Sequence, residues 1–298
     1  MIADVLYNRK ILPAYYRLGI GLKKVPSFKP GQFIMLRITE QVDPLLRRPF
    51  GVYRILGSRV RGQGSRVRGQ GSRVREQGIE ILYKVVGKGT RLMTALKPGD
   101  KLDILGPLGN SFELSHSTGD IIMIAGGIGI APFYLLAERL KAEGFRQRLL
   151  FGGRSKDDLP GLDDFKKLKI NIKISTQDGS VGKKGLVTDL LKSELRTPNS
   201  KLQTIYACGP KGMLKEVERV AKTANAPCYV SLDNVMACGI GACLGCAVKS
   251  RAQSSELRVQ RLKGLKSPLS ALHSESSYKM VCKDGPVFDA WEIEWEEV

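Results

Sequence analysis

Hydrophobic residues along the first hundred positions occur in short runs with turn signals between them. Five runs have the length and apolar content of β-strands, at residues 15–22, 31–39, 49–56, 79–86 and 101–105. Pro-Gly pairs at 30–31 and 98–99 mark strand boundaries. Closely spaced strands of this kind predict a small antiparallel barrel, with a short helix at residues 90–96 across its mouth.

From residue 118 the pattern changes to strands that alternate with helices. Strands are expected at residues 121–125, 148–151, 170–175 and 202–207, and helices at 133–141, 162–168, 186–195 and 213–223. This alternation predicts a parallel sheet covered by helices, with right-handed crossovers. Glycines and a proline interrupt the apolar run at 121–137, which is also shorter than a membrane span. We therefore expect no membrane-spanning segment.

Two polar segments interrupt the chain. Residues 57–77 are three copies of GSRVRGQ, the last with Glu76 in place of glycine, and residues 249–279 form a second insertion. We interpret both as exposed loops. The predicted units are a barrel at residues 1–114 with an insertion at 57–78, a nucleotide-binding α/β domain at 115–226, and a cysteine-rich domain at 227–298 with an insertion at 249–279.

The formal net charge of +19 would ordinarily suggest a nucleic-acid or anionic partner. About half of it lies in the two insertions, since residues 57–78 hold six arginines and one glutamate, and residues 249–279 hold seven Lys/Arg and two glutamates. Neither segment interleaves aromatic with basic residues, so no nucleic-acid partner is expected. The N-terminus does not resemble a secretory signal, so a cytoplasmic location is expected, and six cysteines in such a chain argue against a disulfide framework.

Three of the cysteines lie within nine residues. The spacing Cys238-x4-Cys243-x2-Cys246, with a distant Cys282, is that of a plant-type [2Fe–2S] cluster. Structural zinc is the alternative, but zinc sites usually use two CxxC or CxxH pairs, and only Cys243 and Cys246 form one here. The spacing therefore favours the cluster.

Two glycine-containing turns follow predicted strands and precede predicted helices, AGGIGIAP at residues 125–132 and YACGPKGM at 206–213. Glycines and helix N-termini can accommodate a pyrophosphate, and such turns gather at one edge of a parallel sheet. Glycines required only for close packing are the alternative. In the barrel, RRPFG at residues 47–51 offers Arg48 for a phosphate and Phe50 for a flat ring.

Together these motifs resemble the electron-transfer subunits of class B dihydroorotate dehydrogenase, within the ferredoxin–NADP reductase-like superfamily. The resemblance is carried by SFKPGQF (27–33), RRPFG (47–51), LYKVVGKGT (82–90), GPLGNSF (106–112), IAGGIGIAP (124–132), YACGPKGM (206–213) and the cysteine motif with its closing VCKDGPVF (281–288). It implies a Greek-key barrel and FAD in the crevice between barrel and sheet.

By motif match, the resemblance also implies specific contacts. The expected FAD contacts are Arg48, Pro49, Phe50, Gly51, Leu82, Tyr83, Lys84, Gly89 and Thr90. The expected nicotinamide-nucleotide contacts are Gly126, Gly127, Gly129, Cys208, Gly209 and Pro210, and the cluster ligands are Cys238, Cys243, Cys246 and Cys282. NAD is the expected nucleotide, although Arg154 and Ser155 could hold a 2′-phosphate.

The implied function is an oxidoreductase subunit in pyrimidine biosynthesis. It would pass electrons from an FMN-containing, dihydroorotate-oxidising partner through [2Fe–2S] and FAD to NAD⁺, in a heterotetramer, with no acid–base residue of its own. One alternative is the small subunit of an NADH-dependent ferredoxin:NADP⁺ oxidoreductase or sulfide dehydrogenase. A zinc-stabilised nucleotide-binding module is another. The chain departs from the pattern at Gly51, where many relatives have serine, and in its two insertions.

Overall fold

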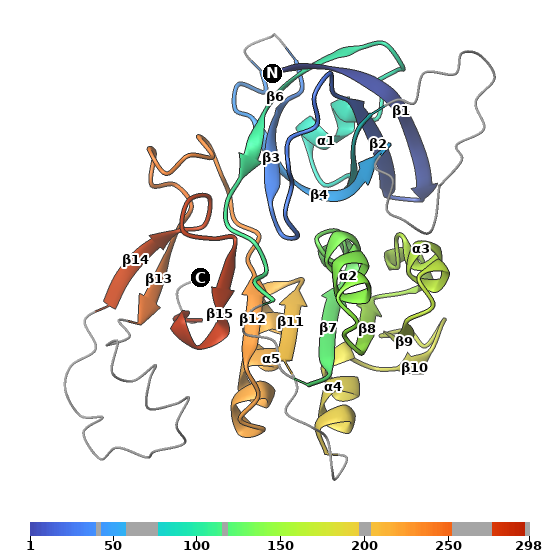
Figure 1. The fold of residues 1–298 in the computed structure, drawn as a ribbon, viewed down its shortest axis with the longest axis vertical. Helices are drawn as coiled ribbons and strands as arrows, with labels where there is room; N and C mark the ends of the chain where they lie inside the picture. Colours follow the sequence, from blue (N-terminus) through green and yellow to red (C-terminus); the bar gives the residue numbers. More distant parts are fainter. Residues whose placement is uncertain (40–42, 58–76, 115–118, 197–203, 252–275, 296–298) are drawn as a thin grey trace.

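The computed structural model describes residues 1–39, 43–57, 77–114, 119–196, 204–251 and 276–295. A barrel lies above a helix-covered sheet, and a small C-terminal unit lies beside both (Figure 1). The predicted fold class is confirmed. The GSRVRGQ repeat and the centre of the second insertion fall outside the described residues, so the interpretation of both as exposed loops stays a prediction.

Six antiparallel strands close the barrel in the order β1-β2-β5-β4-β3-β6. Their bounds are β1 (Ile2–Leu12), β2 (Tyr15–Gly21), β3 (Phe33–Arg37), β4 (Arg48–Leu56), β5 (Gly78–Lys84) and β6 (Lys101–Leu108), with helix α1 at Lys88–Met93. Sequence reasoning missed β1, because Ala3 and Val5 are its only buried side chains. A strand with so short an apolar pattern gives little periodic signal.

Strand β3 shows how the barrel presents two surfaces. Ile34 and Leu36 are packed in the barrel core, whereas Phe33 and Met35 belong to the core that includes the C-terminal unit. Alternate residues of a strand point to opposite faces, so one five-residue strand serves both. The C-terminal unit therefore packs directly on the outside of the barrel.

The sheet has seven strands in the order β10-β9-β8-β7-β11-β12-β15. They are β10 (Lys183–Lys184), β9 (Asn171–Thr176), β8 (Gln147–Gly153), β7 (Ile121–Gly126), β11 (Thr204–Cys208), β12 (Cys228–Ser231) and β15 (Val287–Asp289). All neighbours pair in parallel except β12 and β15, which are antiparallel. The predicted boundary between residues 226 and 227 thus precedes a strand of this sheet.

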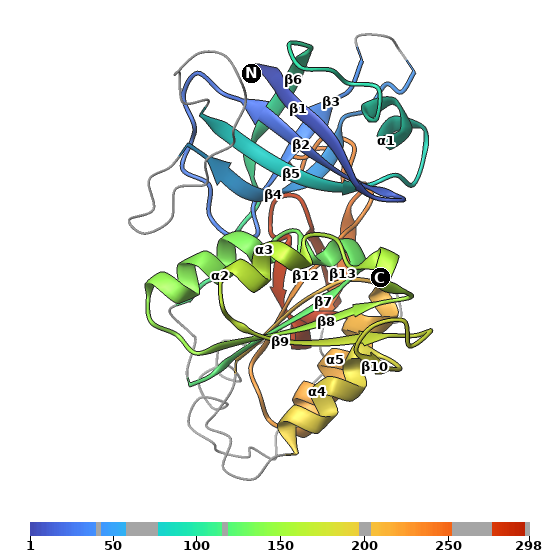
Figure 2. The same cartoon turned by 90° about the vertical axis from the view of Figure 1, so that its right-hand side faces the viewer.

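Helices cover both faces of the sheet (Figure 2). α2 (Phe133–Ala142) and α3 (Leu162–Lys167) lie on the face toward the barrel, and α4 (Val187–Leu195) and α5 (Lys211–Thr223) on the other. Ile121 and Met123 of β7 pack in the first layer, and Ile122 and Ile124 in the second. Among the described residues, no helix combines the length and apolar content needed to cross a membrane.

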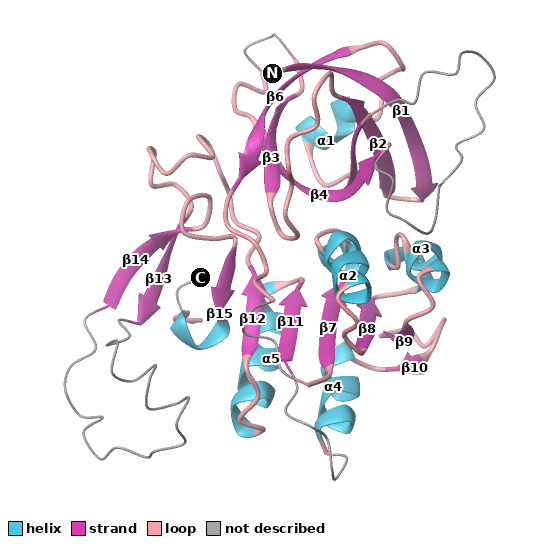
Figure 3. Cartoon of the chain, viewed as in Figure 1, coloured by secondary structure: helices cyan, strands magenta, loops and turns pink. Residues whose placement is uncertain are grey.

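The C-terminal unit consists of the hairpin β13 (Ala247–Arg251) and β14 (Ser276–Met280) and a long loop before it. Figure 3 shows this loop, between β12 and β13, without helix or strand. Three short 3-10 helices complete the elements, η1 (Gly127–Ile130), η2 (Lys156–Asp158) and η3 (Ala290–Glu292). The C-terminal unit is joined to the sheet through β15, which follows β14 in the chain and pairs with β12.

The ends of β7 and β11 pack against each other through glycines. A Cβ atom on Gly129 would lie 2.2 Å from the carbonyl oxygen of Cys208. A Cβ atom on Gly126 would lie 2.8 Å from both the Met213 sulfur and Pro210 Cδ. For these two positions, close packing alone requires glycine.

This packing predicts a specific loss of stability. Gly129→Ala places a methyl group against backbone, so we expect urea unfolding to show a loss of about 1–3 kcal/mol or more. Gly212→Ala is the matched control, because its added Cβ meets nothing within 4 Å. There we expect a change of at most about 1 kcal/mol, in the stabilising direction. Equal stability of the two variants would contradict the account.

Candidate functional site

The four predicted cluster cysteines come together as two pairs. Cys246 and Cys282 have their sulfur atoms 3.3 Å apart, and the Cys238 sulfur interacts with the backbone and thiol of Cys243. Two thiolates on one tetrahedral metal, with bonds of about 2.3 Å, lie roughly 3.8 Å apart. The described residues contain no group of three His, Cys, Asp or Glu side chains arranged around one ion. A two-iron cluster with two protein thiolates on each iron suits this pairing.

Backbone N–H groups of the loop point at these sulfur atoms. Gly241 N lies 3.1 Å from the Cys282 sulfur, and Ile240 N lies 3.5 Å from the Cys238 sulfur. The hydrogen bond from Ile240 is the main cause that lowers the pKa of Cys238 to about 6, whereas burial raises the pKa of Cys282 to about 12. Donors of this kind stabilise negative charge on sulfur and tune a bound cluster.

Asn110 fixes the segment that carries the distant Cys282. Its side-chain nitrogen donates to the carbonyls of Asp284 and Val287 at 3.0 and 2.7 Å, and its side-chain oxygen accepts from Val287 N at 2.9 Å. Asn110 lies within the sequence motif GPLGNSF, but no role was predicted for it. The clamp explains why Cys282 reaches the loop despite the long insertion before it.

The cluster loop rests against the barrel. Gly239 has φ +77°, and a Cβ atom on it would lie 2.5 Å from Met35 Cγ. Met35 pairs in register with Pro49 on β4. Pro49 lies within the predicted flavin motif RRPFG. Adjacent strands are about 4.8 Å apart. Only strand β3 therefore separates the cluster loop from that motif.

Arg48 lies beside the glycine turn that opens α1. A Cβ atom on Gly89 would lie 3.4 Å from Arg48 Nε, and Thr90 Oγ1 accepts from the backbone N–H groups of Val86 and Gly87 at 2.9 and 3.1 Å. A guanidinium next to a glycine turn can hold a phosphate. At Gly51 an added Cβ meets nothing within 4 Å, so the site has room for a side chain such as serine.

Other predicted flavin contacts are less accessible. The side chains of Leu82 and Tyr83 are buried, with 2% and 1% exposed, and the Tyr83 hydroxyl donates to Asn8 Oδ1 at 3.1 Å. Lys84 pairs with Asp158 Oδ1 at 2.9 Å. The buried positions leave their backbone for ligand contact, and the half-buried Phe50 is the accessible aromatic ring of this group.

Three strands end together at the predicted nucleotide turn. Cys208 of β11 pairs with Ala125 of β7 and with Ser231 of β12. Gly127, directly after β7, has φ +54°. A Cβ atom on it would lie 3.5 Å from Tyr15 Oη and 4.0 Å from the Asp158 carbonyl oxygen. Of the three predicted glycines, only Gly127 thus leaves room for an added Cβ atom, whereas Cβ atoms on Gly126 and Gly129 would clash with neighbouring atoms.

The second turn presents mixed accessibility. Cys208 is buried, Gly209 is half-buried, and Pro210 is exposed. Burial raises the pKa of Cys208 to about 12, so its thiol stays protonated at neutral pH. Any contact that it makes with a nucleotide is therefore through a neutral group or the backbone.

Sequence reasoning missed Asp233, two residues beyond the end of β12. Asp233 is exposed as a residue, and desolvation raises the pKa of its carboxyl group. Its charge also raises the pKa of Cys208, so the two groups are close. A carboxylate directly after the third strand end was the available signal.

Comparisons with known proteins agree with this geometry. The sequence family described as "Oxidoreductase NAD-binding domain" matches residues 123–219. That described as "Iron-sulfur cluster binding domain of dihydroorotate dehydrogenase B" matches residues 233–261 and 270–294, which include all four cysteines. The second description favours an iron–sulfur cluster over the zinc alternative.

Two curated relatives match nearly the whole chain. The "Dihydroorotate dehydrogenase B (NAD(+)), electron transfer subunit" of Desulforamulus reducens is 34% identical, over 99% of this chain and 98% of its own. The protein of the same name from Caldanaerobacter subterraneus subsp. tengcongensis is 36% identical, over 98% of each chain.

Solved structures show the same architecture. A chain of an NADH-dependent reduced ferredoxin-NADP oxidoreductase, described for flavin-based electron bifurcation, has a TM-score of 0.76 at 28% identity, over 99% of this chain and 91% of its own. A ferredoxin NADP⁺ reductase from Neisseria gonorrhoeae with bound FAD and NADP shares the fold, with a TM-score of 0.59 at 19% identity, over 75% of this chain and 91% of its own. On the identity and coverage of the curated relatives, the chain belongs to the family of dihydroorotate dehydrogenase B (NAD(+)) electron transfer subunits.

Proposed function

We propose that this chain passes electrons from an FMN-containing, dihydroorotate-oxidising subunit to NAD⁺, through a [2Fe–2S] cluster and FAD bound to the residues described above. Oxidation of one dihydroorotate to orotate supplies the two electrons that reduce one NAD⁺. The observation that carries the proposal is the convergence of Cys238, Cys243, Cys246 and Cys282 on a loop that contacts Met35 through Gly239, one strand from Pro49 of the flavin motif.

The chain's own residues bind and orient in this scheme. Arg48 and the turn at residues 87–90 would hold the FAD phosphates, with Phe50 and Gly51 near the flavin ring. Gly127 leaves room at the end of β7 for the nicotinamide nucleotide. No side chain is assigned as a general acid or base, because the cofactors supply the redox chemistry.

The partner subunit would dock on the outer side of the cluster loop. Cys243 is exposed there, and so are Leu244, Ile240 and Val235, at 62%, 57% and 79%. Leu244 has φ +59°, a conformation that costs a non-glycine residue about 1–2 kcal/mol. Apolar side chains around an exposed ligand, one of them on strained backbone, support a protein interface at the point where electrons enter.

We also propose a heterotetramer with two copies of each subunit, in the cytoplasm. The assembly rests on the family resemblance, and native mass measurement of the co-expressed subunits tests it. The location is supported by the cysteines, none of which forms a disulfide and four of which the proposal assigns to the cluster.

A second candidate is the small subunit of an NADH-dependent ferredoxin:NADP⁺ oxidoreductase. It is favoured by the likeness to the bifurcating enzyme over 99% of this chain. One reconstitution separates the two functions. The chain, co-purified with the dihydroorotate-oxidising subunit, is mixed with dihydroorotate and NAD⁺, and NADH formation is followed. Absence of dihydroorotate-dependent NADH, with ferredoxin-dependent activity present, would favour the second candidate.

The cluster assignment predicts the effect of removing one thiolate. Cys282→Ser leaves an iron with one protein thiolate, so we expect iron content to fall well below two per chain and dihydroorotate-dependent activity to be lost. Cys228→Ala is the control, because Cys228 is a buried cysteine of β12 outside the four. Iron and acid-labile sulfide analysis measures both. A full iron content in Cys282→Ser would contradict the assignment of Cys282 as a cluster ligand.

The proposed partner surface around Leu244 predicts that a substitution there weakens binding of the catalytic subunit. Leu244→Asp introduces a charge at the centre of this surface, so we expect affinity for the catalytic subunit to fall at least about tenfold. Leu186→Asp is the control, since Leu186 is similarly exposed, at 52%, and precedes α4 on the sheet domain. Titration calorimetry or gel filtration compares them. Similar binding by both variants would place the interface elsewhere.

A further inference from the structure

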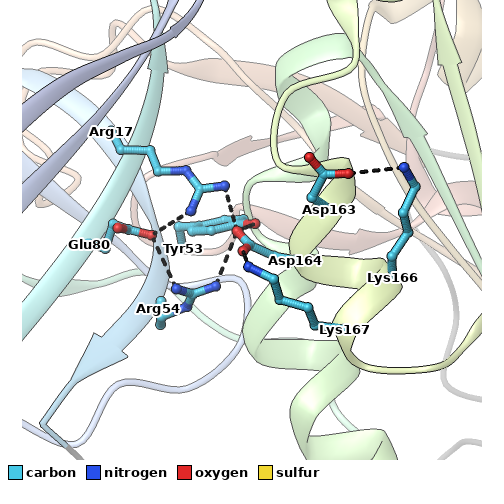
Figure 4. A network of polar contacts seen from close by, with 8 residues as sticks. All are labelled: Arg17, Tyr53, Arg54, Glu80, Asp163, Asp164, Lys166 and Lys167. Carbon is cyan, nitrogen blue, oxygen red and sulfur yellow. Dashed lines mark hydrogen bonds and ion pairs between the residues drawn. The ribbon is translucent and has the colours of Figure 1, made fainter. Parts of the chain in front are cut away.

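A buried polar network joins the barrel to the sheet domain (Figure 4). Asp164 of α3 accepts from Arg17 of β2 at 2.5 Å, from Arg54 of β4 at 3.1 Å, and from the Tyr53 hydroxyl at 2.8 Å. Asp164 is 5% exposed. A single carboxylate of one domain is thus held by three donors of the other.

Apart from Asp164, the guanidinium groups of Arg17 and Arg54 have few partners among the described residues. On the barrel side, Glu80 lies 3.8 and 3.9 Å from the same two arginines, and its other oxygen accepts from Tyr7 at 2.5 Å. The Nε atoms of Arg17 and Arg54 are buried with no hydrogen-bond partner in the structure. Displacing Asp164 would leave two buried guanidinium groups to share the single carboxylate of Glu80, and such a loss is costly. The contact therefore favours one relative position of the domains.

The network shares its elements with both predicted cofactor sites. Tyr53 and Arg54 follow the flavin motif on the same strand, two and three residues after Gly51. Tyr134 belongs to α2, the helix that starts directly after the nucleotide turn. Its ring lies 5.0 Å from that of Tyr53, and Arg54 stacks over it at 4.3 Å. A shift at Asp164 would move one site relative to the other.

A second contact between the domains lies beside Gly127. Asp158 of η2 accepts from the Tyr15 hydroxyl at 2.6 Å and from Lys84 at 2.9 Å. It is more open to solvent than Asp164, with a side chain 18% exposed against 6%. Two separate contacts restrain rotation as well as separation, and the buried one is the stronger restraint.

We propose that Asp164 is a positioning residue for hydride transfer between the nicotinamide and the flavin. This inference rests on the proposed function, in which FAD sits against β4 and the nucleotide at the end of β7. Hydride transfer needs its two reacting atoms about 3–3.5 Å apart, and a misplacement of 1 Å can cost about 100-fold in rate. Asp164 sets that separation from outside both sites, by fixing the domains that carry them.

The test uses the FAD- and iron-loaded chain in complex with its catalytic subunit. Asp164→Asn removes the charge that two arginines share, and Asp163→Asn is the matched control, since Asp163 is 82% exposed and pairs with Lys166 of its own helix (Figure 4). Stopped-flow absorbance follows FAD reduction by NADH. For Asp164→Asn we expect the limiting rate to fall about 10- to 100-fold, with the NADH dissociation constant within about twofold of wild type. Asp163→Asn should match wild type.

A second readout separates positioning from general damage. FAD reduction from the dihydroorotate side enters through the cluster loop and does not cross the Asp164 contact, so we expect its rate to be unchanged. Slowing from both sides would overturn the proposal in favour of a purely structural role, and so would an unchanged NADH rate at full FAD content. Failure of wild type on either side would instead count against the proposed function.

Tyr53→Phe covers the case in which Asp164→Asn does not retain FAD. It removes only the 2.8 Å hydroxyl contact and keeps the ring packing. We expect a smaller fall in the NADH-driven limiting rate, with the dihydroorotate-driven rate unchanged. A Tyr53→Phe protein with full FAD and a wild-type NADH-driven rate would overturn the proposal.

Discussion

The segment directly after Cys282 is the constraint on which the arrangement of this protein depends. It is clamped by Asn110 at the end of the barrel, and it then pairs as β15 with β12 of the sheet. Three parts of the chain therefore meet within a few residues of a cluster ligand. These hydrogen bonds hold the backbone that follows Cys282, so they fix it from its C-terminal side, whereas the insertion precedes it in sequence.

Strands β3 and β4 of the barrel each contribute residues to two neighbouring sites. Strand β3 contributes Ile34 to the barrel core and Met35 to the cluster side, while its neighbour β4 carries first the flavin motif and then the Tyr53–Arg54 contact to the sheet domain. Single strands thus connect adjacent sites. Such a chain of sites suits electron transfer, in which the protein must hold cofactors at fixed separations while they supply the chemistry.

The two contacts between barrel and sheet domain differ in character. Around Asp164, burial would raise the carboxyl pKa, but Arg54, Arg17 and the Tyr53 hydroxyl lower it overall, so the group stays ionised. Around Asp158 the side chains are more exposed, and solvent weakens the pairing. Solvent therefore weakens the attachment at Asp164 less than the one at Asp158 beside the nucleotide turn.

Sequence alone determined the fold class, the cysteine spacing and the two glycine turns, because each depends on local periodicity or on fixed ligand geometry. It did not reveal β1, whose apolar pattern is short, or the roles of Asn110 and Asp164, which are single polar residues without a local signal. Only the tertiary structure decided that Gly126 and Gly129 are packed too closely for a side chain while Gly127 is not. That distinction depends on which backbone approaches from another strand, and no spacing within one segment records such an approach.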